Sequence, residues 1–119
     1  MASTTFSGPV TSTNGFIGNV TGDLVATNQA LSGAGAVNLT DMLTSLTSTG
    51  AAQALTLADG AVGQIKIISH VVDGGSAVLT PTTKIGFSTI TFTAVGESAM
   101  LIYTAAGWAI VALNGAVAA

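Results

Sequence analysis

The chain contains no cysteine and very few charged residues. Without cysteine it has no disulfide framework and no thiolate for catalysis or metal binding. Only 6% of its 119 residues are charged, whereas an average soluble protein has roughly 25%. Because 49% of the residues are apolar, a single copy would expose more apolar surface than soluble monomers usually do. The composition therefore favours self-association.

Positive charge is scarcer still, and this excludes one class of partner. Lys66 and Lys84 are the only basic residues apart from one histidine, and the net charge is −3. Binding to a phosphate backbone needs a cationic patch, which two lysines do not make. The longest apolar tract, residues 105–119, is broken by glycine and asparagine and is shorter than the roughly 20 residues of a membrane span. We expect neither nucleic acid nor a membrane as a partner.

Acid–base chemistry would have to be built from a few isolated residues. His70 is the only histidine, and neither it nor Glu97 belongs to a spaced metal-binding or catalytic motif. Asp59 and Asp73 each stand directly before a glycine, a position where aspartate normally serves a turn. We therefore expect no enzyme activity, no metal site and no cofactor.

Residues 54–113 form a series of short apolar segments between turn residues. Glycine, proline and aspartate recur about every 8–12 residues, and the segments between them are rich in β-branched and aromatic side chains. This spacing predicts an all-β fold, an antiparallel meander that forms a small sandwich or barrel-like domain. The predicted strands are 54–57, 64–72, 77–80, 89–93, 99–104 and 108–113.

Residues 40–49 carry two conflicting signals. Leu39, Met42, Leu43 and Leu46 follow helical spacing, and Thr40 could cap a helix. However, six of the ten residues are serine or threonine, which are weak helix formers. We predict a strand.

The predicted strands differ in how their two faces are composed. Along 64–72, one face is predicted to carry Ile65, Ile67 and Val71, and the other to carry Gln64, Lys66, Ile68, His70 and Val72. Residues 99–104 and 108–113 are apolar on both faces, so we expect both faces to be covered by a second sheet or by another subunit.

The first 36 residues are predicted to form an N-terminal arm. The motif Phe-x-Gly-x-Val-Thr occurs at 6–11 and again at 16–21, which suggests two short β rungs that need neighbours to pack against. Residues 23–36 are small and polar and are predicted to be a connector. The resulting division is an arm at 1–36, which contacts a trimer or a capsid, and a β domain at 37–119.

Several segments resemble small structural proteins of bacteriophage particles. Residues 6–16 (FSGPVTSTNGF) are similar to the start of many phage head-decoration and other virion proteins, and residues 57–64, 90–93, 96–103 and 107–111 add to the likeness. The resemblance to capsid decoration (cement) proteins implies a β-rich homotrimer on the outer surface of the phage head, where it stabilises contacts between neighbouring major capsid subunits.

This resemblance also implies which residues make contacts. Tyr103 and Trp108 would be aromatic residues of the trimer or of the core. The expected capsid or trimer contacts in the arm are Phe6, Pro9, Val10, Asn14, Phe16, Ile17 and Val20.

Two other functions are compatible with the sequence. A trimeric tail-fibre or spike component could bind a host glycan through Trp108, Tyr103 or the threonine-rich loop 80–83. A flat threonine rank at 89–93 could bind ice, although a repeated Thr-x-Thr ladder is missing.

Overall fold

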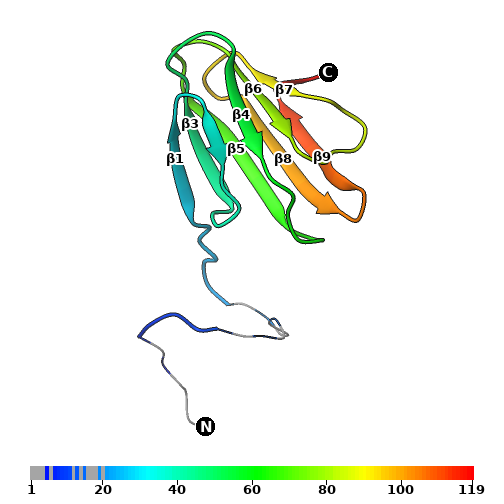
Figure 1. Cartoon of the computed structure of the whole chain (residues 1–119). Helices are drawn as coiled ribbons and strands as arrows, with labels where there is room; N and C mark the ends of the chain where they lie inside the picture. Colours follow the sequence, from blue (N-terminus) through cyan, green and yellow to red (C-terminus); the bar gives the residue numbers. More distant parts are fainter. Residues whose placement is uncertain (1–4, 6, 12, 14, 16–18, 20) are drawn as a thin grey trace.

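The computed structural model describes residues 5, 7–11, 13, 15, 19 and 21–119. The described residues form ten strands and no helix, so they include no helix able to cross a membrane. The strands form two five-stranded sheets, sheet A in the order β1-β3-β5-β8-β9 and sheet B in the order β10-β7-β6-β4-β2 (Figure 1). Their bounds are β1 Asn28–Ser32, β2 Gly35–Val37, β3 Leu43–Thr47, β4 Gln53–Leu57, β5 Ile65–Val72, β6 Ala77–Pro81, β7 Ile90–Phe92, β8 Ser98–Thr104, β9 Gly107–Asn114 and β10 Val117–Ala118.

The first six strands form a coil. Consecutive strands alternate between the sheets, so β1, β3 and β5 pair in parallel in sheet A, while β2, β4 and β6 pair in parallel in sheet B. The predicted antiparallel meander is therefore wrong for this half of the domain. Turn residues mark where a strand ends, but they do not say whether the next strand returns to the same sheet or crosses to the opposite one. Here each strand of one sheet serves as the crossover between parallel strands of the other.

The last four strands close the coil in antiparallel pairing. β8 pairs with β5 and with β9, and β7 pairs with β6 and with β10. The hairpin of β8 and β9 is a local antiparallel unit, with Tyr103 opposite Trp108 and Thr104 opposite Gly107. For this hairpin the meander prediction is right, because a two-residue turn leaves the chain no other partner.

The prediction of an all-β fold is confirmed, and each predicted strand has a counterpart whose ends differ by one residue at most. The strand within 40–49 is also confirmed, as β3. The connector predicted at 23–36 is wrong for its second half, where β1 and β2 form. The side chain of Gln29 helps to hold these two strands in place. It donates to Ala36 O and accepts from Asn38 N and Thr44 Oγ1 at 2.8–2.9 Å. These tertiary bonds join β1 to both sheets, which a polar and glycine-rich composition does not reveal.

The core lies between the two sheets and is mostly aliphatic. Sheet B contributes Leu55, Leu57, Leu79 and Ile90, all at most 1% exposed, and sheet A contributes residues such as Leu101. Four polar side chains are also buried: Thr44 and Ser48, and Lys66 and His70, which are both 0% exposed on the inner face of β5. The predicted face grouping of Lys66, Ile68 and His70 is thus confirmed, and that face is the buried one.

The alternation of faces ends at the last two residues of β5. The register of β3 and β5 shifts between Leu46 and Thr47, which face His70 and Val72 respectively. Val71 and Val72 are both exposed as a result, because a bulge breaks the strict two-residue period. The grouping of Val72 with His70 is therefore wrong.

Candidate interaction surface

Among the described residues, one serine contacts the histidine, and the surroundings of this pair indicate a structural role. Ser48 Oγ lies 2.9 Å from His70 Nε2 and also accepts a hydrogen bond from Gly74 N. Both side chains are at most 2% exposed, and no protein group bonds His70 Nδ1. A nucleophile needs access to substrate and an oriented base, whereas this pair joins β3 to β5 inside the core.

The acidic residues considered in the sequence serve turns. Asp73 Oδ1 accepts from Gly75 N, and Asp59 accepts from both the backbone and the hydroxyl of Thr83. The Glu97 carboxylate accepts from Thr93, and this hydrogen bonding lowers the pKa of Glu97 below its usual value. Over the described ranges, no three His, Asp or Glu side chains gather as a metal site would require.

Lys66 supports the loop before β3 from inside the domain. Its Nζ donates to Asp41 O at 2.6 Å and to Asn38 Oδ1 at 3.4 Å, and Asn38 Nδ2 in turn donates to Asp41 Oδ2 at 2.7 Å. Burial lowers the pKa of Lys66, and the negative charge of Asp41 offsets part of that shift. The Asn38 bond lowers the pKa of Asp41. The buried cation thus fixes the position of residues 38–42.

This arrangement predicts that stability rises at alkaline pH. The unfolded chain binds a proton at Lys66 up to about pH 10.5, whereas the folded chain releases it at lower pH. The cost of burying the charge is therefore fully present at neutral pH and is relieved as pH rises through the lowered pKa. Urea unfolding of Lys66→Met from pH 7 to pH 10.5, at fixed protein concentration, should show a smaller rise than the parent protein. Lys84→Met should keep the rise; an equal loss in both variants would contradict the role of Lys66.

The outer face of sheet A carries an apolar surface that nothing in the described chain covers. Its side chains alternate along each strand with buried ones, and most are half-buried. Register aligns them in two rows across the sheet, the first from β3 to β9 and the second from β5 to β9. The rows, which we call the sheet A face, are Leu43, Ile67, Met100 and Ala112, followed by Ile65, Ile102 and Ala109.

Charge is absent from this face. Within the ten strands, Lys66 is the only Asp, Glu, Lys or Arg residue, and both Lys66 and His70 are buried in the core. Ser45, Ser69 and Ser98 align in the next row and give the face a polar border. The outer face of sheet B differs, with small or hydroxyl-bearing residues such as Ala54 and Thr56. An apolar centre with an uncharged polar edge is the usual composition of a protein–protein interface.

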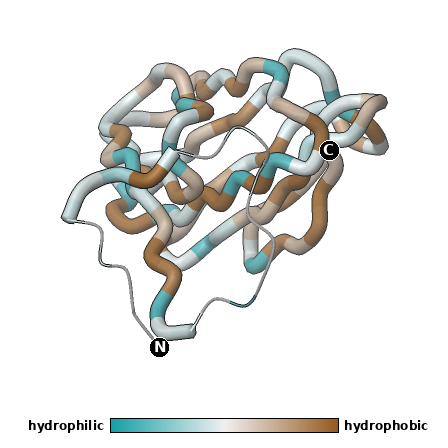
Figure 2. The backbone as a smooth tube through the Cα atoms, turned by 90° about the horizontal axis from the view of Figure 1, so that it is seen from below, coloured by the Kyte–Doolittle hydropathy of each residue, from teal (hydrophilic) through white to brown (hydrophobic). Residues whose placement is uncertain are grey.

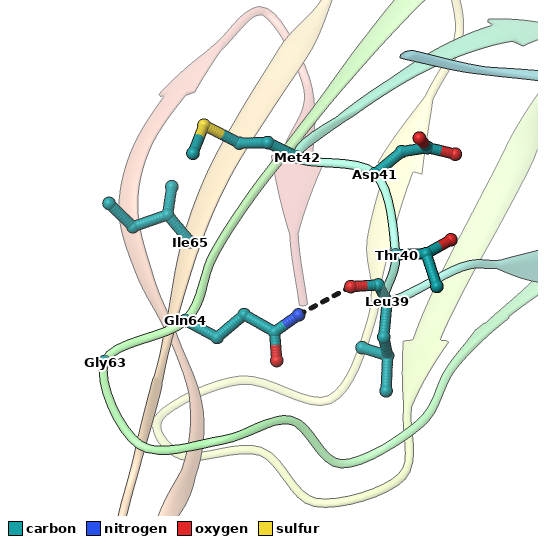
Figure 3. A pocket seen from close by; sticks show the side chains of 7 residues that line it. All are labelled: Leu39, Thr40, Asp41, Met42, Gly63, Gln64 and Ile65. Carbon is teal, nitrogen blue, oxygen red and sulfur yellow. Dashed lines mark hydrogen bonds between the residues drawn. The ribbon is translucent and has the colours of Figure 1, made fainter. Parts of the chain in front are cut away.

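A pocket lies at the foot of the sheet A face, where β3 and β5 begin (Figure 3). Its volume is about 330 Å³, and its walls are the loops 39–42 and 63–65. Gln64 joins the walls, because its Nε2 donates to Leu39 O at 2.8 Å. Met42 and Ile65 lie on the same side of it; Ile65 is the first residue of the second apolar row, and Met42 precedes Leu43, the first residue of the other row. The pocket and the face are therefore one continuous surface.

The segment that leads into β1 extends this surface. Leu24 and Val25 are 83% and 84% exposed, and with Thr40 and Met42 they line a second hollow beside the first. Seen from the foot in Figure 2, hydrophilic positions are short and scattered between apolar stretches. The exposed apolar area thus runs from the sheet A face to the base of the arm.

The residues proposed from sequence fall into different parts of the structure. Trp108 is fully buried, and Tyr103 packs edge-on against it with ring centroids 5.1 Å apart. Pro9 and Val10 are exposed, Val10 at 65%. The remaining arm residues lie outside the described residues; they are Phe6, Asn14, Phe16, Ile17 and Val20.

The sequence analysis above does not predict the sheet A face as a site, although the alternation of side chains along β8 carries a signal for it. Met100 and Ile102 alternate with Ala99 and Leu101, so two apolar sets of different size share β8. Both sets are apolar, so alternation alone does not say which one meets the second sheet. Burial in the structure makes that distinction.

Comparison with known proteins places the chain in no family. Neither the scan against protein-family models nor the search of curated proteins found a match.

Proposed function

We propose that this protein is a structural, non-enzymatic component of a phage particle: a homotrimeric decoration protein on the outer surface of the head that stabilises contacts between neighbouring major capsid subunits. The observation that carries the proposal is the apolar, uncharged sheet A face on a chain with only two lysines and five acidic residues. Such a surface is costly in water and favours permanent association. The assignment to a phage particle rests on the segments that resemble phage virion proteins.

A trimer suits a role in holding a shell together. Three identical subunits on a three-fold position present three copies of each contact, and linked weak contacts combine into strong binding. The chain supplies no charge patch for attraction to the shell, so binding rests on shape and apolar contacts. We assign the shell contacts to the arm.

The base of the arm supports that assignment. Residues 21–27 are exposed and contain no strand, and they lead away from the foot of β1 (Figure 1). The repeated Phe-x-Gly-x-Val-Thr motif precedes them in the sequence. An apolar segment that finds little to pack on within its own domain gains most by adding to a neighbouring protein.

Reconstitution of undecorated heads tests this function. The full chain should bind the heads and appear as three-fold density on their outer surface in cryo-electron microscopy, and it should raise the temperature at which they release DNA. A variant that lacks residues 1–20 should remain folded, with unchanged circular dichroism, but should bind the heads at least tenfold more weakly. Density confined to the tail, or full binding without the arm, would contradict the proposal.

A tail-fibre or spike component that binds host glycan is the second candidate. The pocket at the foot favours it, because Thr40 and Asp41 offer polar groups beside apolar Leu39 and Met42, a mixture that suits a sugar ring. Trp108 is not available for stacking on a sugar because it is fully buried. Binding on a glycan array that is lost in Asp41→Asn and kept in Asp59→Asn would favour this candidate over the decoration protein.

A further inference from the structure

We propose that the sheet A face is the surface on which three copies of this chain associate, packed around a three-fold axis with the base of each arm at the same end. This inference rests on the trimer of the proposed function, but it does not depend on a phage particle. The occupant of the face is the same face of two further copies.

The chemistry of the face favours its own copy as the partner. The first row places branched or long aliphatic side chains on three neighbouring strands, with Leu43, Ile67 and Met100, and the second row adds Ile65 and Ile102 on two strands. No charge on the face must find an opposite charge on a partner, so like faces meet without repulsion. The serine row gives a border that tolerates water. Around a three-fold axis, one side of each face packs on the other side of the next copy's face, and a face without charge allows this contact.

The available area indicates how much of the chain takes part. The four strands of the face, about 4.8 Å apart and each contributing about five residues at about 3.3 Å, cover on the order of 300 Å². A partner in a standard interface contributes about 800 Å². The face therefore needs further contact area, and Leu24 and Val25 lie next to it at its foot with more than four-fifths of each residue exposed. The interface thus extends from the two apolar rows onto residues 21–27.

The position of the arm determines the end of the trimer from which the arms leave. β1 begins at Asn28 opposite Leu43, the first residue of the apolar rows. With three sheet A faces around one axis, the three arms leave the trimer at one end, each from the sheet edge that β1 forms. The opposite end, which carries the turn at Asp73, then points away from whatever the arms bind.

A pair of matched glutamate variants tests the interface. Met100→Glu places a charge in the middle of the sheet A face, and Val78→Glu places the same charge on a half-buried outer position of β6 in sheet B. By light scattering, the parent protein and Val78→Glu should have a mass about three times that of the 11.6 kDa chain. Met100→Glu should have about one third of that mass, because a buried unpaired charge is not tolerated in an interface.

Cysteine variants keep the test decisive if Met100→Glu does not fold. The chain has no cysteine of its own, so Met100→Cys and Val78→Cys each give a single reactive thiol. A short bis-maleimide should link Met100→Cys into covalent pairs and leave Val78→Cys as single chains.

The outcomes separate this inference from the proposed function. A folded, trimeric Met100→Glu, or failure of Met100→Cys to cross-link within a trimer, would place the trimer contact elsewhere and leave the decoration protein standing. A parent protein that stays monomeric at all concentrations would overturn both. A dimer of the parent protein would overturn the three-fold arrangement.

Discussion

Replacing Trp108 with alanine should lower the free energy of unfolding by roughly 3–5 kcal/mol, the usual cost of removing a large buried aromatic side chain. Trp108 is the largest fully buried side chain of the domain. It fills the end of the core below the hairpin of β8 and β9, where Tyr103 packs edge-on against it at an interplanar angle of 74°. Its Nε1 donates to Ala58 O at 2.8 Å, so the ring also holds the loop that follows β4.

Two further variants separate the parts of this effect. Trp108→Phe keeps most of the packing but leaves Ala58 O without its donor, and it should cost about 1–3 kcal/mol. Val62→Ala removes a side chain that is 73% exposed and should change stability by less than about 0.5 kcal/mol. The measurement is urea unfolding at one protein concentration, because the proposed association would make the unfolding midpoint depend on concentration. A cost for Trp108→Ala near that of Val62→Ala would mean that the ring is not in the core.

The elements that sequence predicted well are those fixed by neighbours in the chain. The hairpin of β8 and β9 follows from two apolar segments around the Ala105–Ala106 turn, and β5 follows from a long run of β-branched residues. β3 was also predictable, because its threonine content weakens a helix more than its leucine spacing favours one. In each case the local preference and the tertiary structure agree.

The topology was not predictable for a physical reason. The turn after β5 contains Asp73 and two glycines, which is typical of a hairpin. In the structure this turn takes the chain across to sheet B, and its backbone packs on the turn that follows β3. Whether the chain forms a hairpin or crosses to sheet B is decided by tertiary contacts. One of these is the hydrogen bond that Gly74 N donates to Ser48 Oγ, between residues 26 positions apart. No local pattern encodes such a contact.

The candidate site, like the fold, can be predicted from the sequence only in part. Alternation shows that the later strands are apolar on both faces. Composition favours self-association, which stays a prediction. The sequence does not predict the sheet A face. It predicts a connector where β1 and β2 form, and it does not show which strand pairs with β3. The apolar rows exist only in the register that joins Leu43 of β3 to Ile67 of β5 and Met100 of β8. Parallel pairing of β3 with β5 and antiparallel pairing of β5 with β8 place them together, although they are 24 and 33 residues apart in the sequence.

Gly75→Ala should destabilise the domain by roughly 3–5 kcal/mol, the sum of overpacking and backbone strain. Gly75 has a φ of 142°, and a Cβ on it would lie 2.4 Å from the carbonyl carbon and oxygen of Gly50 and 2.8 Å from Ala51 N. These are backbone atoms, so neither turn relieves the overlap by rotating a side chain. Because total stabilities are commonly about 5–15 kcal/mol, this substitution removes a large part of the stability of the domain.

Gly96→Ala is the matched control for the Gly75 effect. Gly96 has a φ of 90°, but a Cβ there meets no atom within 4 Å, so this variant should show only the conformational cost of about 1–2 kcal/mol. The difference between the two variants, measured by urea unfolding and by hydrogen exchange at Ser48 and Gly74, reports the contact between the turn after β3 and the turn after β5. Equal costs would mean that these turns are not stacked and that β3 and β5 do not belong to successive levels of one coil. A larger cost for Gly75→Ala is expected because the parallel pairing of β3 with β5 brings these two turns to the same end of the domain.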